Sequence, residues 1–70
     1  MSKVIEIVLN GKIRTIAEGS TLQTLVDSLR LDASTLVIEL NETVVNKSTM
    51  HTTELYAQDK VEVLQFVGGG

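Results

Sequence analysis

Hydrophobic positions near the start of the chain recur at the short spacing of β-strands. Residues 3–9, KVIEIVL, are dense in β-branched side chains and carry one internal charge, which predicts a strand buried on at least one face. The dipeptide Asn-Gly at 10–11 follows, and both residue types tolerate the positive φ of a two-residue hairpin turn. Residues 12–16 are therefore expected to pair back antiparallel. Ile13 and Ile16 fall on opposite faces, which leaves a bulge or twist possible.

The spacing then lengthens to that of an α-helix. Apolar residues at i, i+3, i+4 and i+7 form one stripe, made of Leu22, Leu25, Val26 and Leu29. Ser20 is a suitable N-cap, and Gln23 three residues later completes a capping box. The sequence Asp-Ala-Ser at 32–34 ends the pattern, so one helix is predicted between these limits.

Strand-like patterns return in the second half of the chain. Residues 35–40 predict a strand with Leu36, Ile38 and Leu40 on one face. A turn is indicated at 41–42, and a short strand at 44–45. The last strand is expected at 60–67.

Residues 46–59 have a weak pattern, which indicates a loop with a short strand or helical turn. Its expected core anchors are Met50, Leu55 and Tyr56.

The order of elements predicts an α+β fold. One helix can cover only one face of a mixed sheet, and a ferredoxin-like fold would need a second helix. The best match is a β-grasp, ubiquitin-like roll with four to five strands and one main helix. The 70 residues leave room for one domain, expected at 1–67, followed by a flexible C-terminal glycine tail at 68–70.

The amino-acid composition excludes most types of catalytic site. The chain has no cysteine and one histidine, His51, which excludes disulfides, thiol nucleophiles and metal sites built on cysteines or several imidazoles. His51 is expected to be a solvated loop residue. The carboxylates Glu6, Glu39 and Glu62 alternate with apolar residues, as on a solvated sheet face. We therefore expect no catalytic residues, no metal site, no bound cofactor and no enzyme activity.

Charge and hydropathy limit the classes of partner that the chain can bind. The net charge is −3, and the six Lys and Arg residues are scattered, so no nucleic-acid partner is expected. A mildly acidic surface fits a basic protein partner and plain solubility equally well. Apolar runs do not exceed three residues and the start does not resemble a signal peptide. No membrane association and a cytoplasmic location are therefore expected.

The glycine tail that follows the last strand is the candidate functional element. Glycine has no side chain to obstruct a narrow channel, and three residues carry a carboxylate about 10 Å beyond the strand. Such a carboxylate becomes electrophilic when it attacks the α-phosphate of ATP and forms an acyl-adenylate, from which a sulfur or nitrogen nucleophile displaces AMP. The activating partner would have to supply ATP, magnesium and the catalytic residues. A frayed end or a linker is the alternative.

The motifs LNGK at 9–12 and DKVEVLQFVGGG at 59–70 give a family resemblance. With them the chain resembles, over its whole length, the ThiS family of sulfur carriers in bacterial thiamine biosynthesis. The family's terminal Gly-Gly maps onto Gly69 and Gly70, with Gly68 preceding. The resemblance implies that an E1-like, ThiF-like adenylyltransferase activates Gly70. It also implies that a persulfide protein donates the sulfur, and that the resulting thiocarboxylate serves a thiazole synthase.

Three alternatives stay open. The related carrier for molybdopterin synthesis shares the fold and the Gly-Gly end, but is usually longer and lacks this ending. A ubiquitin-like modifier would be joined to lysines of other proteins, although an arginine normally precedes the Gly-Gly of ubiquitin. A plain β-grasp binding module would have an irrelevant tail.

Alternation along the last strand predicts a docking patch beside the tail. If Val61 and Val63 face the helix, Leu64 and Phe66 stand on the open face of the sheet. Exposed apolar side chains next to a reactive terminus indicate a protein contact, so we expect Leu64 and Phe66 to touch the activating enzyme. In the opposite register Phe66 would belong to the core.

Overall fold

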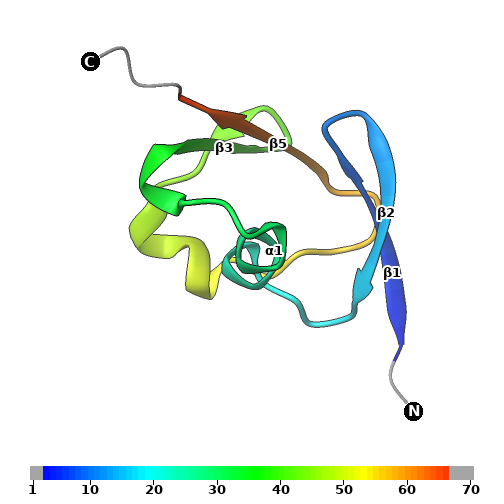
Figure 1. Ribbon diagram of the computed structural model, residues 1–70. Helices are drawn as coiled ribbons and strands as arrows, with labels where there is room; N and C mark the ends of the chain where they lie inside the picture. Colours follow the sequence, from blue (N-terminus) through cyan, green and yellow to red (C-terminus); the bar gives the residue numbers. More distant parts are fainter. Residues whose placement is uncertain (1–2, 67–70) are drawn as a thin grey trace.

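The computed structural model describes residues 3–66, which form one mixed sheet with an α-helix packed on one face (Figure 1). The elements are β1 (Val4–Leu9), β2 (Lys12–Ala17), α1 (Leu22–Leu29), the 3₁₀ helix η1 (Ala33–Thr35), β3 (Leu36–Leu40), β4 (Thr43–Val44), the 3₁₀ helix η2 (Lys47–Thr52) and β5 (Lys60–Gln65). In this part of the chain the sheet has five strands in the order β2-β1-β5-β3-β4. β1 and β5 are parallel, and the other neighbours are antiparallel. This arrangement confirms the predicted β-grasp roll.

The first hairpin forms at the predicted turn. Asn10 and Gly11 have φ of 49° and 80°, which Asn and Gly accept with little strain. The pairing of β1 with β2 runs without interruption from Val4 opposite Ala17 to Leu9 opposite Lys12. The possible bulge is therefore absent from this ladder. The strand keeps regular geometry because Ile13 is left on the outer face, where it is 71% exposed.

Helix α1 has the predicted apolar stripe but a different N-cap. Thr21 caps the helix, and its hydroxyl accepts a hydrogen bond from the Thr24 N–H over 3.1 Å. The predicted capping box on Ser20 is wrong, because Ser20 lies one residue too early. Its hydroxyl donates to the Ala17 carbonyl, and its own carbonyl accepts from the N–H of Leu55. A segment distant in sequence therefore sets the start of the helix.

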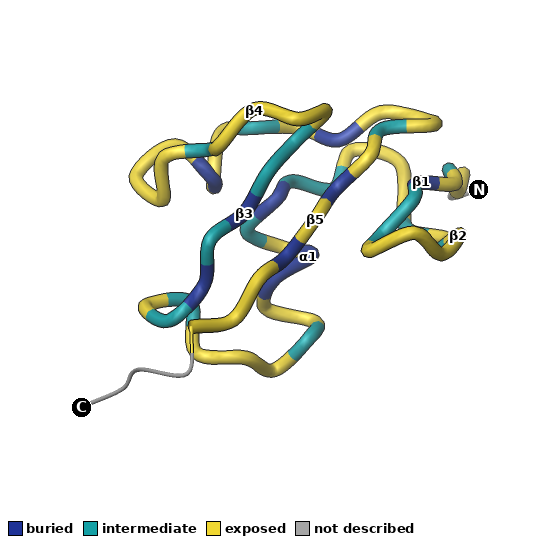
Figure 2. Tube along the Cα trace, turned by 90° about the horizontal axis from the view of Figure 1, so that it is seen from above, coloured by how far each residue is buried: buried dark blue, intermediate teal, exposed yellow. Residues whose placement is uncertain are grey.

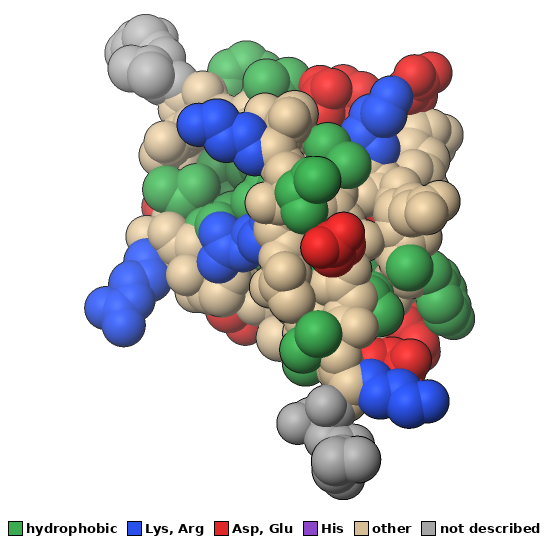
Figure 3. Space-filling view, turned by 90° about the vertical axis from the view of Figure 1, so that its right-hand side faces the viewer, with side chains coloured by type: hydrophobic (Ala, Val, Ile, Leu, Met, Phe, Trp, Pro, Cys, Tyr) green, Lys and Arg blue, Asp and Glu red, His purple; other side chains and the backbone are tan. Residues whose placement is uncertain are grey.

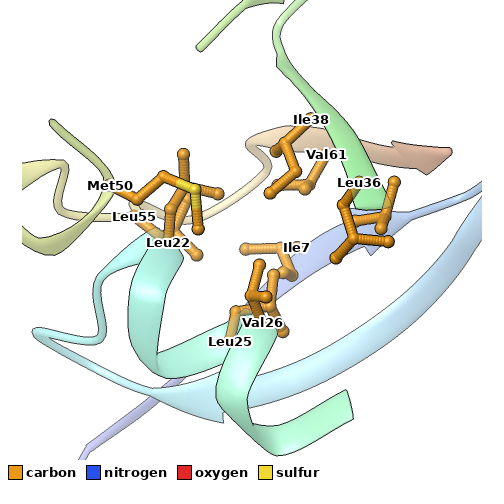
Figure 4. Packing of buried hydrophobic residues seen from close by; sticks show 10 residues of the cluster. Ile7, Leu22, Leu25, Val26, Leu36, Ile38, Met50, Leu55 and Val61 are labelled. Atoms are coloured by element: carbon orange, nitrogen blue, oxygen red, sulfur yellow. The ribbon is translucent and has the colours of Figure 1, made fainter. Parts of the chain in front are cut away.

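The core lies between α1 and the inner face of the sheet (Figure 4). Its buried members are Ile7, Leu22, Leu25, Val26, Leu36, Ile38, Met50, Leu55, Val61 and Val63. Met50 and Leu55 are core anchors as predicted, but Tyr56 is not. Tyr56 is 62% exposed, because it follows the buried Leu55 and its N–H donates to the Asp59 carboxylate in the turn before β5.

The remaining connections follow their sequence signals closely. The turn between β3 and β4 places Asn41 and Glu42 at φ of 50° and 72°. The short strand β4 begins one residue earlier than expected, and the weakly patterned region contains η2. Among residues 3–66, no helix combines the length and the apolar character needed to cross a membrane.

Candidate functional site: the open sheet face beside the tail

Strand β5 presents two kinds of side chain on its two faces. Val61 is fully buried and Val63 is 9% exposed, whereas Leu64 and Phe66 are 52% and 67% exposed. Figure 2 looks down on β3 and β5, with α1 beneath them, and shows buried and exposed positions alternating along β5. The predicted register is therefore confirmed, and Phe66 does not belong to the core.

A shallow apolar groove lies at the tail end of this face. Its lining residues are Val37, Leu64, Gln65 and Phe66, and its volume is about 200 Å³. We call this surface the tail-end groove. Val37 stands directly opposite Leu64 in the pairing of β3 with β5, so the two side chains form one continuous apolar surface. Removing such an apolar surface from contact with water is favourable, so the groove is suited to binding an apolar side chain of another protein.

Hydrogen bonds fix the position from which the tail departs. The N–H of Phe66 donates to the Thr35 carbonyl over 2.7 Å, which continues the ladder one step beyond β5. Thr35 is held in turn by Asp32, whose carbonyl accepts from both the N–H and the hydroxyl of Thr35. The orientation of Phe66 thus depends on the turn η1 as well as on β3.

Asp32 organises that turn electrostatically. Its carboxylate accepts hydrogen bonds from the hydroxyl and the N–H of Ser34, over 2.7 and 3.0 Å. These bonds lower the pKa of Asp32, with a smaller contribution from the positive charge of Lys47. The ammonium group of Lys47 also donates to the Ser34 carbonyl over 3.1 Å. The turn that positions Phe66 is therefore strengthened when Asp32 is ionised.

The other half of the open face has a different character. Over β1 and β2, hydrophobic side chains stand apart among polar and charged ones (Figure 3). Val4 and Ile13 are exposed there, with Glu6 between them on the outer side of β1. Glu6 and Glu62 are exposed and Glu39 is half-buried, as expected for carboxylates on the outer face of the sheet.

No group of three or more His, Asp or Glu residues within 3–66 is placed to hold a metal ion. His51 is exposed in η2, as predicted. A larger open cavity of about 570 Å³ is lined by Ile5, Glu18, Gly19, Glu54, Leu55, Tyr56 and Ala57. No histidine, serine or threonine lines it, so it does not hold the hydroxyl–imidazole pair that many acyl-transfer enzymes use.

Several predicted site residues fall beyond the described part of the chain. Gly68, Gly69 and Gly70 lie outside it, as does the expected domain boundary after residue 67. Conversely, the roles of Val37 and of the turn at Asp32 were not predicted from the sequence. Val37 lies between two inward-facing residues of β3, so its outward direction was readable, but its pairing with Leu64 was not.

Comparisons with known proteins converge on one family. The model of the ThiS family matches residues 7–70. The "Sulfur carrier protein ThiS" of Bacillus subtilis is 35% identical over 63 residues, covering 89% of this chain and 96% of that protein. The crystal structure of the thiamine biosynthesis protein ThiS from Geobacter metallireducens superimposes with a TM-score of 0.82 at 32% identity. It covers 94% of this chain and 100% of that one.

A second kind of relative is much longer. A protein named thiazole synthase, from Paramagnetospirillum magneticum, is 31% identical over 65 residues. The match covers 93% of this chain but only 20% of that protein. A segment similar to almost the whole of this chain therefore occurs within a polypeptide that carries that name.

Proposed function

The chain belongs to the ThiS family, and from this membership we propose that it is a sulfur carrier protein of thiamine biosynthesis, a protein cosubstrate rather than an enzyme. The observation that carries this function is the extent of the family match, from Ile7 to Gly70, which includes all three terminal glycines. The fold agrees, since a solved ThiS structure superimposes on nearly the whole chain.

The chemistry is centred on the α-carboxylate of Gly70. One carboxylate oxygen attacks the α-phosphate of ATP and pyrophosphate leaves, which yields a Gly70 acyl-adenylate. The terminal sulfur of a cysteine persulfide on a donor protein then displaces AMP and forms an acyl disulfide. A thiol then attacks the cysteine Sγ of the donor protein in that S–S bond. A new disulfide forms with the donor cysteine, and the former terminal persulfide sulfur stays on Gly70 as a thiocarboxylate. ATP, Mg²⁺ and the catalytic groups belong to a ThiF-like adenylyltransferase.

The described residues supply the surface that the partner recognises and fix the position from which the chain leaves the sheet. In this account the partner docks on the tail-end groove, with Leu64 and Phe66 as the principal contacts. Both side chains are already exposed, so docking does not require the core to open. The hydrogen bond from Phe66 to Thr35 fixes where the chain leaves the sheet, which reduces the entropy lost when Gly68 and Gly69 enter the partner's active site.

The receiver of the sulfur is a thiazole synthase. The thiazole synthase of Paramagnetospirillum magneticum supports this, because a segment similar to this chain is part of that protein. We infer that the present chain delivers its thiocarboxylate sulfur to a separate thiazole synthase. A molybdopterin-type carrier, the main alternative, is less well supported than the thiamine carrier, because the family match and the ThiS relatives point to thiamine.

ATP–pyrophosphate exchange with the host's adenylyltransferase tests the function. The full chain should support exchange, whereas a chain lacking Gly69 and Gly70 should not, although it should fold and unfold like the parent. Equal exchange by both chains would show that the terminal carboxylate is not the activated group. Formation of adducts on lysines of other proteins, with no thiocarboxylate, would instead identify a ubiquitin-like modifier.

A further inference from the structure

Two glutamates are cross-strand partners on the open side of the sheet, next to the tail-end groove. Glu39 of β3 and Glu62 of β5 are partners in the antiparallel register. The N–H of Asn41 donates to the Lys60 carbonyl, and the N–H of Phe66 donates to the Thr35 carbonyl. These bonds lie two and four residues away from the Glu39–Glu62 pair, at the alternate positions where antiparallel strands exchange hydrogen bonds. Glu39 and Glu62 therefore occupy a hydrogen-bonded position of the ladder, with Cβ atoms about 5 Å apart.

This arrangement is unfavourable for the isolated chain. Like charges directly opposite each other in a sheet are destabilising. Among residues 3–66 the one ion pair joins Lys60 to Glu42, over 3.8 Å. Lys60, which precedes Glu62 by two residues on β5, is therefore paired with a different carboxylate. Glu39 is half-buried, which weakens the screening of its charge by water. The pair thus places two negative charges in one row of the open face, and within residues 3–66 neither carboxylate forms an ion pair.

The pair has apolar neighbours on two sides, whereas Asn41 and Lys60 form the row on the side away from the tail. Val44 of β4 stands opposite Glu39 on its other side and is exposed. Val37 and Leu64 form the next row of the same face, about 7 Å nearer the tail. A partner that covers this row and Val44 would exclude water from the two carboxylates, and a cation held there would interact more strongly than at an open surface.

We propose that Glu39 and Glu62 together receive one arginine side chain from the adenylylating partner, while apolar side chains of that partner fill the tail-end groove. A planar guanidinium has donors on two edges and can bond both carboxylates at once, which a compact ammonium does less well. The repulsion between the two glutamates is relieved on docking, so the pair favours the complex over the free carrier. This pairing rests on the proposed sulfur-carrier function and specifies the chemistry of its partner.

Neutral substitutions separate this role from a structural one. Glu39→Gln and Glu62→Gln retain the shape of the side chains and remove one charge each. Each should raise the Kd for the adenylylating enzyme, and the KM for the carrier in pyrophosphate exchange, by about tenfold, as expected for the loss of one charge-assisted hydrogen bond. The kcat should not change. The melting temperature should stay the same or rise, because repulsion is removed, and binding should depend less on salt.

Glu18→Gln is the matched control. It makes the same change in net charge at an exposed position in the loop between β2 and α1, and should leave Kd and KM unchanged. An equal loss of binding in this control would assign the effect to net charge and overturn the pairing. A lowered melting temperature in Glu39→Gln and Glu62→Gln, accompanying weaker binding, would overturn it in favour of a structural role.

Failure of the pairing and failure of the sulfur-carrier function give different results. If Glu39→Gln and Glu62→Gln bind as tightly as the parent while Leu64→Ala binds weakly, the docking face is correct and the arginine contact is wrong. If the parent chain itself supports no exchange with the adenylylating enzyme, the carrier function fails first. Loss of binding confined to the two Gln variants and Leu64→Ala, with Glu18→Gln unaffected, supports the pairing.

Discussion

The side chain of Asn10 bonds to the main chain of Val63 at both of its polar groups. The Val63 N–H donates to Asn10 Oδ1 over 2.8 Å, and Asn10 Nδ2 donates to the Val63 carbonyl over 3.3 Å. The register of β1 with β5 covers only Val8 and Leu9, after which the chain turns into the first hairpin. The amide of Asn10 therefore extends the contact along β5, toward the residues that form the tail-end groove.

Replacing Asn10 by Ala should destabilise the domain by about 2–3 kcal/mol. Two partly buried hydrogen bonds are lost, each contributing about 1 kcal/mol, and Ala is strained at the φ of 49°. Denaturant unfolding measures the change. Asn10→Gly separates the two causes, since Gly accepts the positive φ but cannot bond Val63. If Asn10→Gly were as stable as the parent, the hydrogen bonds to Val63 would contribute nothing to the free energy of unfolding.

Val63→Ala and Phe66→Ala should differ sharply in stability, although the two residues lie close together in the chain. Val63 is 9% exposed, so its truncation leaves a cavity and should lower the free energy of unfolding by about 1–3 kcal/mol. Phe66 is 67% exposed, and its truncation should change that free energy by less than about 0.5 kcal/mol. Thermal and denaturant unfolding of both variants decide this. A large loss in Phe66→Ala would place its ring in the core, contrary to the structure.

Leu64→Ala should weaken binding to the adenylylating enzyme by about tenfold without loss of stability, because it removes one wall of the tail-end groove. Ile13→Ala is the matched control, since Ile13 is also exposed on the outer face but lies on β2. Calorimetric titration of each variant with the enzyme gives the two dissociation constants. Similar weakening by both substitutions would mean that general surface hydrophobicity, not the groove, drives the contact.

Stability should fall at acid pH partly through Asp32. Hydrogen bonds from Ser34 hold the pKa of Asp32 below its ordinary value in the folded chain. The stabilisation is therefore complete above the unfolded-state pKa and is lost as the pH falls through the lower folded-state pKa. Unfolding midpoints measured from pH 7 down to pH 2 should fall less in Asp32→Asn than in the parent. Parallel curves for the two proteins would show that Asp32 contributes nothing to the pH dependence.

Local patterns in the sequence predicted much of the fold. The four-residue stripe of α1, the Asn-Gly turn and the alternation along β5 each depend on neighbouring residues, so their periods could be read directly. Alternation also placed Leu64 and Phe66 together on one face of β5, and the structure shows that this face is the exposed one.

Contacts between distant segments could not be read in this way. Thr21 rather than Ser20 caps α1 because Leu55 binds the Ser20 carbonyl, an interaction that spans 35 residues of sequence. The amide of Asn10 finds Val63 across 53 positions, and Val37 becomes part of the groove only through its pairing with Leu64. Such pairings depend on strand order and register, which a single sequence does not specify locally.

The most direct test of the carrier function is the intact mass of the chain isolated from its native host without reducing agent. If the chain is a sulfur carrier, a population should be heavier by the difference between one sulfur and one oxygen atom, with the change confined to a peptide ending at Gly70. An unmodified mass that persists after incubation with ATP, the host's adenylylating enzyme and a persulfide donor would contradict the carrier function.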